Sequence, residues 1–188
     1  VKVDNNKLKK IAINKKSKES KLFLPQTIKD LEKWCNKNPD GILVGGATDV
    51  GLWVTKKLMD LKQICFIGQI SEMSQIKTAN QSLNIGACTT IETLRNSIKI
   101  SHPEFSELLR RYGSTQVRNA ATIGGNIANG SPIGDSSPAL IALGATISLN
   151  LNGKHRTIPI EEFFIKYGLQ NKQKGEFIES INMPGKEE

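Results

Sequence analysis

Hydrophobic positions recur at helical spacing near the start of the folded part of the chain. Ile28, Leu31 and Cys35 fall on one face of a predicted helix. Thr27, followed three residues later by Asp30, is typical of a helix N-terminus, because both side chains can bind the free N–H groups of the first turn. We therefore expect an amphipathic helix that buries this face.

Two apolar runs that follow, Ile42–Val44 and Ile64–Ile67, predict short buried strands. A glycine-rich segment and a helix-like stretch, Val50–Leu58, lie between them. Strand, helix and strand at this spacing predict a βαβ unit with parallel strands. The pattern therefore predicts a small first subdomain over residues 22–74.

From about residue 75 the predicted strands and helices become shorter and indicate a larger second subdomain over residues 75–185. Two patterns, Thr89-x-x-Glu92 and Ser101-x-x-Glu104, predict capping boxes at helix starts. The other predicted elements are a strand at 83–86, a helix at 136–143, a hairpin turning at Asn152-Gly153 and a final strand at 177–183. The expected fold class is α+β, with a small βαβ parallel-sheet subdomain and a larger mixed or antiparallel-sheet subdomain with helices.

The net charge of +8 does not change the expected fold class, because the charge excess is concentrated at the start of the chain. Residues 1–37 hold 11 Lys and four acidic residues, and the remainder is nearly balanced. Residues 1–21 are polar, without sustained periodicity, and predict a linker or disordered lead-in. Their lysines lack interleaved aromatics, so we expect no nucleic-acid partner. No window reaches about 18 apolar residues, so we expect no membrane partner.

The cysteines and histidines suggest no catalytic or metal chemistry. Cys35, Cys65 and Cys88 show neither a CxxC pair nor metal-ligand spacing, so we expect reduced core thiols in a cytoplasmic protein. His102 and His155, the only histidines, adjoin a predicted helix start and a hairpin turn, where surface positions are expected. Neither forms a recognisable triad, so no catalytic residue and no metal site are predicted.

The first candidate binding segment, residues 44–51 (VGGATDVG), directly follows a predicted buried strand. Glycines at such a turn allow backbone N–H groups to approach an anion such as a pyrophosphate. The carboxyl ends of parallel strands are also where such sheets bind ligands. The segment contains neither GxGxxG nor a Walker sequence. A purely structural turn is the alternative interpretation, since glycine serves any position that needs a positive φ.

The second candidate segment, Thr122–Asp135, has four glycines, two asparagines and a proline. This composition predicts a long irregular loop, and loops of this length are uncommon without a function. Its hydroxyl and amide side chains can bind sugar hydroxyls, while Asp135 can accept hydrogen bonds from a ribose or an adenine amine. The alternative is that Asp135 only caps the helix that begins at Ser136.

These two segments, together with Gln116–Ala120 and Pro138–Ala145, resemble the PCMH-type FAD-binding domain of the molybdenum hydroxylase family, specifically the small subunit of bacterial xanthine dehydrogenases. The resemblance implies that the first segment wraps the FAD pyrophosphate and the second contacts the diphosphate and ribityl chain. It places Asp135 on the adenosine side, with Tyr112 and Ile178 near the flavin, although both could instead be core residues. The implied cofactor-binding residues are Leu43, Val44, Gly45, Gly46, Ala47, Thr48, Asp49, Val50, Tyr112, Thr122, Ile123, Gly124, Gly125, Asn126, Asp135 and Ile178.

The resemblance also implies a function. Electrons from purine oxidation would reach FAD through 2Fe–2S clusters and leave to NAD+, with a molybdopterin-binding large subunit as partner. The family's iron–sulfur domain and C-terminal flavoprotein domain are absent from the chain, so we expect a fragment that is inactive alone. The alternatives are a flavin subunit acting with another molybdenum hydroxylase on carbon monoxide, an aldehyde or an aromatic acyl thioester, and a docking module that has lost FAD.

Overall fold

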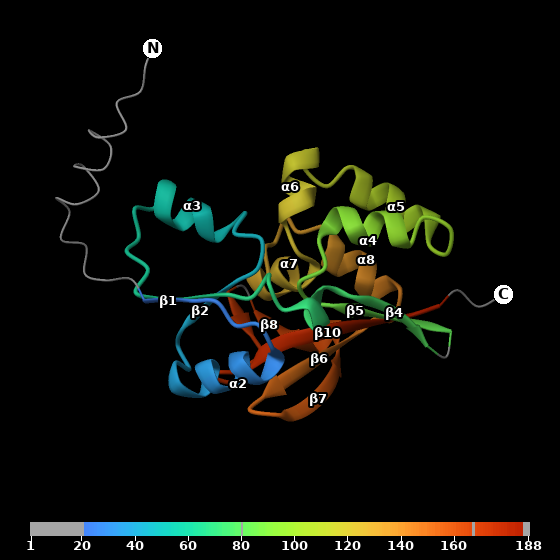
Figure 1. The fold of residues 1–188 in the computed structure, drawn as a ribbon. Helices are drawn as coiled ribbons and strands as arrows, with labels where there is room; N and C mark the ends of the chain where they lie inside the picture. The colour runs from blue at the N-terminus through green and yellow to red at the C-terminus, as the bar shows by residue number, and fades with distance from the viewer. Residues whose placement is uncertain (1–20, 80, 167, 186–188) are drawn as a thin grey trace, which may run out of the picture.

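The computed structural model describes residues 21–79, 81–166 and 168–185, which are drawn in colour in Figure 1. Within these ranges the chain forms a small parallel sheet and a larger antiparallel sheet with helices, as the α+β pattern predicts. The linker predicted over residues 1–21 lies outside the described residues, apart from Lys21.

Three short strands form the parallel sheet, in the order β1–β3–β2. They are β1 (Lys21–Phe23), β2 (Ile42–Val44) and β3 (Gln63–Phe66). The predicted βαβ unit is confirmed, because β2 and β3 pair in parallel, with Val44 opposite Phe66. The sequence pattern did not predict β1, which pairs with the other side of β3.

The two helices of this region differ in how firmly they pack. Helix α2 (Ile28–Lys37) starts as predicted, with Thr27 Oγ1 accepting a hydrogen bond from the N–H of Asp30. Helix α3 (Val50–Thr55) ends before the predicted Leu58 and buries none of its residues. Figure 1 shows α3 standing away from both sheets. A short helix has little stability of its own, and α3 lacks the packing that would extend it.

Five strands form the antiparallel sheet, in the order β4–β5–β10–β6–β7. The final strand, β10, therefore lies in the middle, and its residue Ile181 pairs with Ile85 on one side and Ile147 on the other. The predicted hairpin is confirmed, with Asn152 and Gly153 at its turn. The strands are β4 (Ile76–Ala79), β5 (Ser82–Gly86), β6 (Thr146–Leu151), β7 (Lys154–Pro159) and β10 (Phe177–Pro184).

Five helices accompany this sheet, and Figure 1 shows them gathered on one side of it. They are α4 (Ile91–Ser97), α5 (Pro103–Arg110), α6 (Thr115–Ala120), α7 (Ile123–Asn129) and α8 (Ser136–Ala142). Two 3₁₀ turns, η1 (Ser71–Ser74) and η2 (Ile160–Phe163), and a small pair of strands, β8 (Phe164–Lys166) and β9 (Leu169–Gln170), complete the described part.

Both predicted capping boxes are wrong. Helix α4 is capped by Thr90, whose Oγ1 accepts a hydrogen bond from the N–H of Thr93. Glu92 instead turns its carboxylate toward two arginines. Helix α5 begins with Pro103, which has no N–H to cap, and no side-chain hydrogen bond caps it within the described residues.

One hydrophobic cluster extends across both sheets and includes Cys35, Cys65 and Cys88 as buried free thiols. Burial raises their pKa values to about 11, 12 and 12, so the thiols are uncharged near neutral pH. His102 is also buried, so its expected surface position is wrong. Its ring nitrogens contact Ser101 Oγ and the carbonyl of Pro184, a residue that is distant in sequence.

Candidate cofactor-binding cleft

A cleft of about 660 Å³ opens where the carboxyl end of β2 meets helix α7 and the segment after α5. Its volume lies within the range of about 300–1,000 Å³ that is usual for small-molecule and cofactor sites. The lining combines the two glycine-rich segments, which are far apart in sequence. The fold therefore brings together the segments that the sequence singled out separately.

Residues 45–49 of the first segment follow β2 and line one wall of the cleft. Ala47 has φ +59°, a left-handed conformation that is unfavourable for a residue with a Cβ and is concentrated at functional sites. Within the described part of the chain, no group accepts a hydrogen bond from the N–H groups of residues 46–49. The segment thus presents unpaired amide donors beside an open cleft, a combination suited to binding an anion.

The two glycine-rich segments approach each other closely. A Cβ on Gly46 would lie only 1.6 Å from the carbonyl oxygen of Ala120, and one on Gly45 would lie 2.7 Å from Thr122 Oγ1. Gly46 is therefore required for backbone packing against the end of α6. This contact explains the glycine without any bound ligand.

The second segment is not the irregular loop that its composition predicts. Residues 123–129 form α7, with Thr122 at the N-cap accepting a hydrogen bond from the N–H of Gly125. A Cβ on Gly124 would lie 2.4 Å from the Cβ of Ala87, so this glycine serves close helix packing. Tertiary packing here outweighs the low helix propensity of glycine. Only residues 130–135 form a connecting turn before α8.

A chain of side-chain hydrogen bonds links two residues that line the cleft, Tyr112 and Asn126, to the buried Ser136. Asn126 donates from Nδ2 to the phenol oxygen of Tyr112 over 2.9 Å, and its Oδ1 accepts a hydrogen bond from Ser136. Burial raises the pKa of Tyr112, and the negative charges of Asp49 and Asp135 raise it further. Tyr112 is therefore a neutral phenol whose ring is held by a fixed partner.

The charged side chains of the cleft are few. Asp49 accepts a hydrogen bond from Trp53 Nε1 over 3.1 Å, and Asp135 is exposed and makes no side-chain capping bond to α8 in the described structure. Asp135 occupies the N-cap position of α8, but its side chain makes no capping hydrogen bond among the described residues. Arg111 is the only cationic side chain that lines the cleft among the described residues. Negative charge on a ligand would thus be met mainly by backbone dipoles.

The cleft gathers most of the residues expected to bind a cofactor. Four of them do not line it: Val44, Ile123 and Gly124 are buried behind the wall, and Ile178 is a core residue of β10, 6% exposed and opposite Leu149 on β6. The residues that line it are Leu43, Gly45, Gly46, Ala47, Thr48, Asp49, Val50, Tyr112, Thr122, Gly125, Asn126 and Asp135.

Other lining residues were not predicted. Arg111 and Gly113 flank Tyr112, and Val117 lies in the Gln116–Ala120 segment that carries the family resemblance. These three residues could therefore be inferred from the sequence. Trp53 lies two residues after the first glycine-rich segment. No sequence pattern indicated that Gln170 lines the cleft, because it belongs to a strand that is distant in sequence and folds back to the cleft.

The two-sheet fold and the cleft between its glycine-rich segments define a cofactor-binding α+β domain. The chain belongs to the family described as the FAD binding domain in molybdopterin dehydrogenase, whose model matches residues 17–186. The recognised resemblance to the molybdenum hydroxylase FAD domain is thereby confirmed.

Curated relatives carry several different names. The chain is 29% identical to xanthine dehydrogenase 1 of Arabidopsis thaliana, over 86% of this chain and 13% of that protein. It is 30% identical to the glyceraldehyde dehydrogenase medium chain of Sulfolobus acidocaldarius, over 86% of this chain and 57% of that protein. The chain therefore spans only about an eighth of the first relative and just over half of the second.

Solved structures agree on the fold. Carbon monoxide dehydrogenase from Hydrogenophaga pseudoflava matches with a TM-score of 0.84 and 24% identity, covering 89% of this chain and 59% of that one. Quinoline 2-oxidoreductase from Pseudomonas putida 86 matches with a TM-score of 0.83 and 18% identity, covering 88% and 59%. Within the described residues, no helix has the length and apolar character needed to cross a bilayer.

Proposed function

We propose that this cleft binds FAD through the two glycine-rich segments. The observation that carries the proposal is the row of N–H groups at residues 46–49, which have no hydrogen-bond partner among the described residues and lie beside the cleft, an arrangement that suits a diphosphate. Thr122 and Asn126 offer polar atoms for the ribityl chain, and exposed Asp135 offers a carboxylate to the adenosine. The ring of Tyr112 would pack beside the isoalloxazine.

The described residues that line the cleft would position the cofactor. Bound FAD would supply the redox chemistry, and in the complete protein it would connect 2Fe–2S clusters with NAD+ as the electron acceptor. Tyr112 stays neutral beside Asp49 and Asp135, because its pKa is raised, and so remains a hydrogen-bonding partner without charge. Asn126 fixes the orientation of its ring.

In the complete protein we propose the role of a xanthine dehydrogenase small subunit, partnered by a molybdopterin-binding large subunit in the cytoplasm. The Arabidopsis relative and the family membership support this assignment. A second candidate is the flavin subunit of another molybdenum hydroxylase. The relative named glyceraldehyde dehydrogenase supports that candidate, because its identity of 30% is as high.

The binding proposal is tested by titrating FAD into the purified chain and following tryptophan fluorescence. Trp53 lines the cleft, whereas Trp34 stacks on Phe23 and does not line it. Saturable quenching that Trp53→Phe abolishes, without loss of binding measured by equilibrium dialysis, is the expected result. Asp135→Ala should weaken binding by about tenfold, as loss of a charge-assisted hydrogen bond does. A chain that takes up no FAD would instead match a docking module without flavin.

The substrate class is tested in the assembled enzyme that contains this chain. Flavin reduction under anaerobic conditions is compared with hypoxanthine, xanthine, glyceraldehyde, carbon monoxide and an aromatic acyl thioester as reductants. Reduction by the purines alone supports the first candidate. Reduction by one of the others alone supports the second.

A further inference from the structure

Arg118, on α6, contacts the backbone of the Tyr112–Gly113 segment that lines the cleft. Its Nη1 donates to the carbonyl of Gly113 over 2.9 Å and lies 3.4 Å from that of Tyr112. Its Nη2 donates to Thr115 Oγ1 over 3.0 Å, at the start of the same helix. The side chain is only 11% exposed, so these bonds are largely protected from water.

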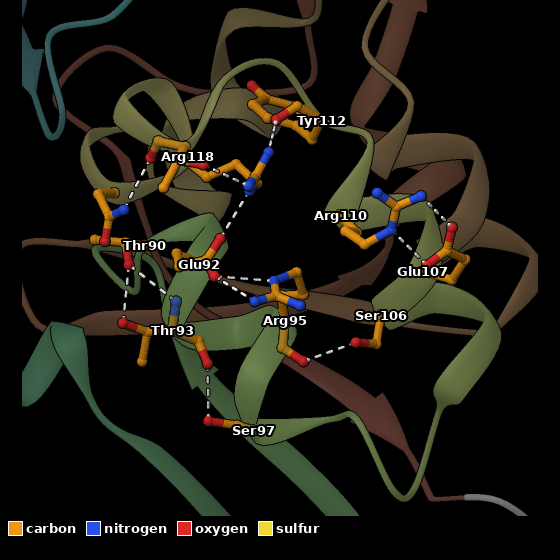
Figure 2. Close-up of polar contacts among 12 residues, drawn as sticks. Thr90, Glu92, Thr93, Arg95, Ser97, Ser106, Glu107, Arg110, Tyr112 and Arg118 are labelled. Atoms are coloured by element: carbon orange, nitrogen blue, oxygen red, sulfur yellow. Dashed lines mark hydrogen bonds and ion pairs between the residues drawn. The ribbon is translucent and has the colours of Figure 1, made fainter.

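Glu92 fixes the guanidinium of Arg118 from the opposite side. Its Oε2 accepts from Arg118 Nε over 2.7 Å, while Oε1 accepts from Arg95 Nε over 3.0 Å. Figure 2 shows the carboxylate of Glu92 between the two arginines, with Arg118 reaching on toward Tyr112. The two arginines share one partner, but only Arg118 also contacts the cleft wall.

We propose that Arg118 is a positioning residue for the flavin site, acting through the backbone of the Tyr112–Gly113 segment. It does not line the cleft itself. By holding two successive carbonyl groups against α6, it sets the direction from which the Tyr112 ring enters the cleft. Asn126 fixes the other end of that ring by binding its phenol oxygen. The backbone and the hydroxyl of Tyr112 are thus held independently.

The effect of Arg118 on FAD binding rests on the proposed function. Its hold on the backbone of the Tyr112–Gly113 segment does not. Two matched variants separate the structural role from the effect on FAD. Arg118→Met removes the contacts to Glu92, Thr115 and the wall, and Arg95→Met removes only the side-chain contacts of Arg95 to Glu92. Amide hydrogen exchange of the peptide covering residues 111–114, measured without FAD, reports how firmly the wall is held. FAD dissociation constants are then measured for both variants.

The expected result is faster exchange of residues 111–114 in Arg118→Met alone, with global stability checked by urea unfolding of both variants. FAD binding should weaken by about tenfold in Arg118→Met and by less than about twofold in Arg95→Met. Equal exchange in the two variants would overturn the inference and leave the proposed function standing. Absence of FAD binding by the unsubstituted chain would overturn the proposed function, while the exchange difference would still support the structural role of Arg118.

Discussion

The side-chain amide of Asn126 donates a hydrogen bond to the phenol oxygen of Tyr112 over 2.9 Å, which links α7 to the segment that follows α5. The two residues belong to different parts of the cleft wall and are 14 positions apart. This bond joins the glycine-rich helix to an aromatic ring that the family resemblance places near a flavin. Removing this hydrogen bond is the most direct test of whether it stabilises the cleft wall.

Tyr112→Phe should lower the free energy of unfolding by about 1 kcal/mol, because the Asn126 amide loses its acceptor in a half-buried site. The aromatic ring remains, so FAD affinity should fall less than in Arg118→Met. Urea unfolding and FAD titration of the same preparation check both effects. An unfolding free energy equal to that of the unsubstituted chain would show that the bond contributes nothing.

Glu92 should make stability depend on pH in the acid range. Hydrogen bonds from Arg95 and Arg118 lower its pKa from the ordinary 4.5 to about 2, so the folded state favours the ionised carboxylate. Its contribution is present above pH 4.5 and is lost as pH falls toward 2. The stability difference between the unsubstituted chain and Glu92→Gln should therefore shrink over that range.

Glu107→Gln is the matched control for this pH dependence. Glu107 also pairs with an arginine, Arg110, which lowers its pKa, but its side chain is 51% exposed and water screens the pair. Its substitution should change unfolding between pH 2 and 7 much less than that of Glu92 does. Equal pH profiles for the two variants, recorded by thermal unfolding, would show that the partly buried ion pairs of Glu92 with Arg95 and Arg118 contribute no more to stability than the exposed pair of Glu107 does.

Gly124→Ala should destabilise the protein by about 1–3 kcal/mol, because the new methyl group would overlap Ala87 in the core. Gly51→Ala, in the exposed helix α3, is the control. A Cβ there meets no atom within 4 Å, so a gain of about 0.4–1 kcal/mol is expected. Chemical denaturation of both variants measures the contrast. Similar effects of the two substitutions would refute the explanation given for α7.

The three cysteines should resist alkylation in the native protein. Burial raises their pKa values to about 11 or 12, so almost no thiolate is present at pH 8. Iodoacetamide followed by mass spectrometry should detect no modification under native conditions and three additions in denaturant. Rapid native labelling of Cys88 would show that the core beside β3 opens readily.

Elements with a strong local signal could be predicted from the sequence. Thr27 and Asp30 marked the start of α2, and Asn152-Gly153 marked the hairpin turn. Helix α7 could not be predicted, because Gly124 is needed for close packing against Ala87, which lies on a segment distant in sequence. The cap of α4 was misplaced by one residue, since Thr89 and Thr90 are both suitable in composition and the fold selects Thr90.

The candidate site likewise contains residues that could be predicted from the sequence and residues that could not. The segments that begin at Val44 and Thr122 could be chosen from composition and family resemblance. The placement of Gln170 could not, because it depends on how β9 folds back toward α7. Arg118 lies in the Gln116–Ala120 segment that carries the family resemblance, but its bonds to the carbonyls of Tyr112 and Gly113 depend on the conformation of the connection between α5 and α6.

The central place of β10 in the antiparallel sheet imposes an order on folding. Strands β5 and β6 are separated in space by β10, which is the last of the three to leave the ribosome. The parallel sheet can form while synthesis continues, but the larger sheet has a gap at its centre until residues 177–184 emerge. Nascent chains stalled before Phe177 should therefore expose the edges of β5 and β6 and depend on chaperones.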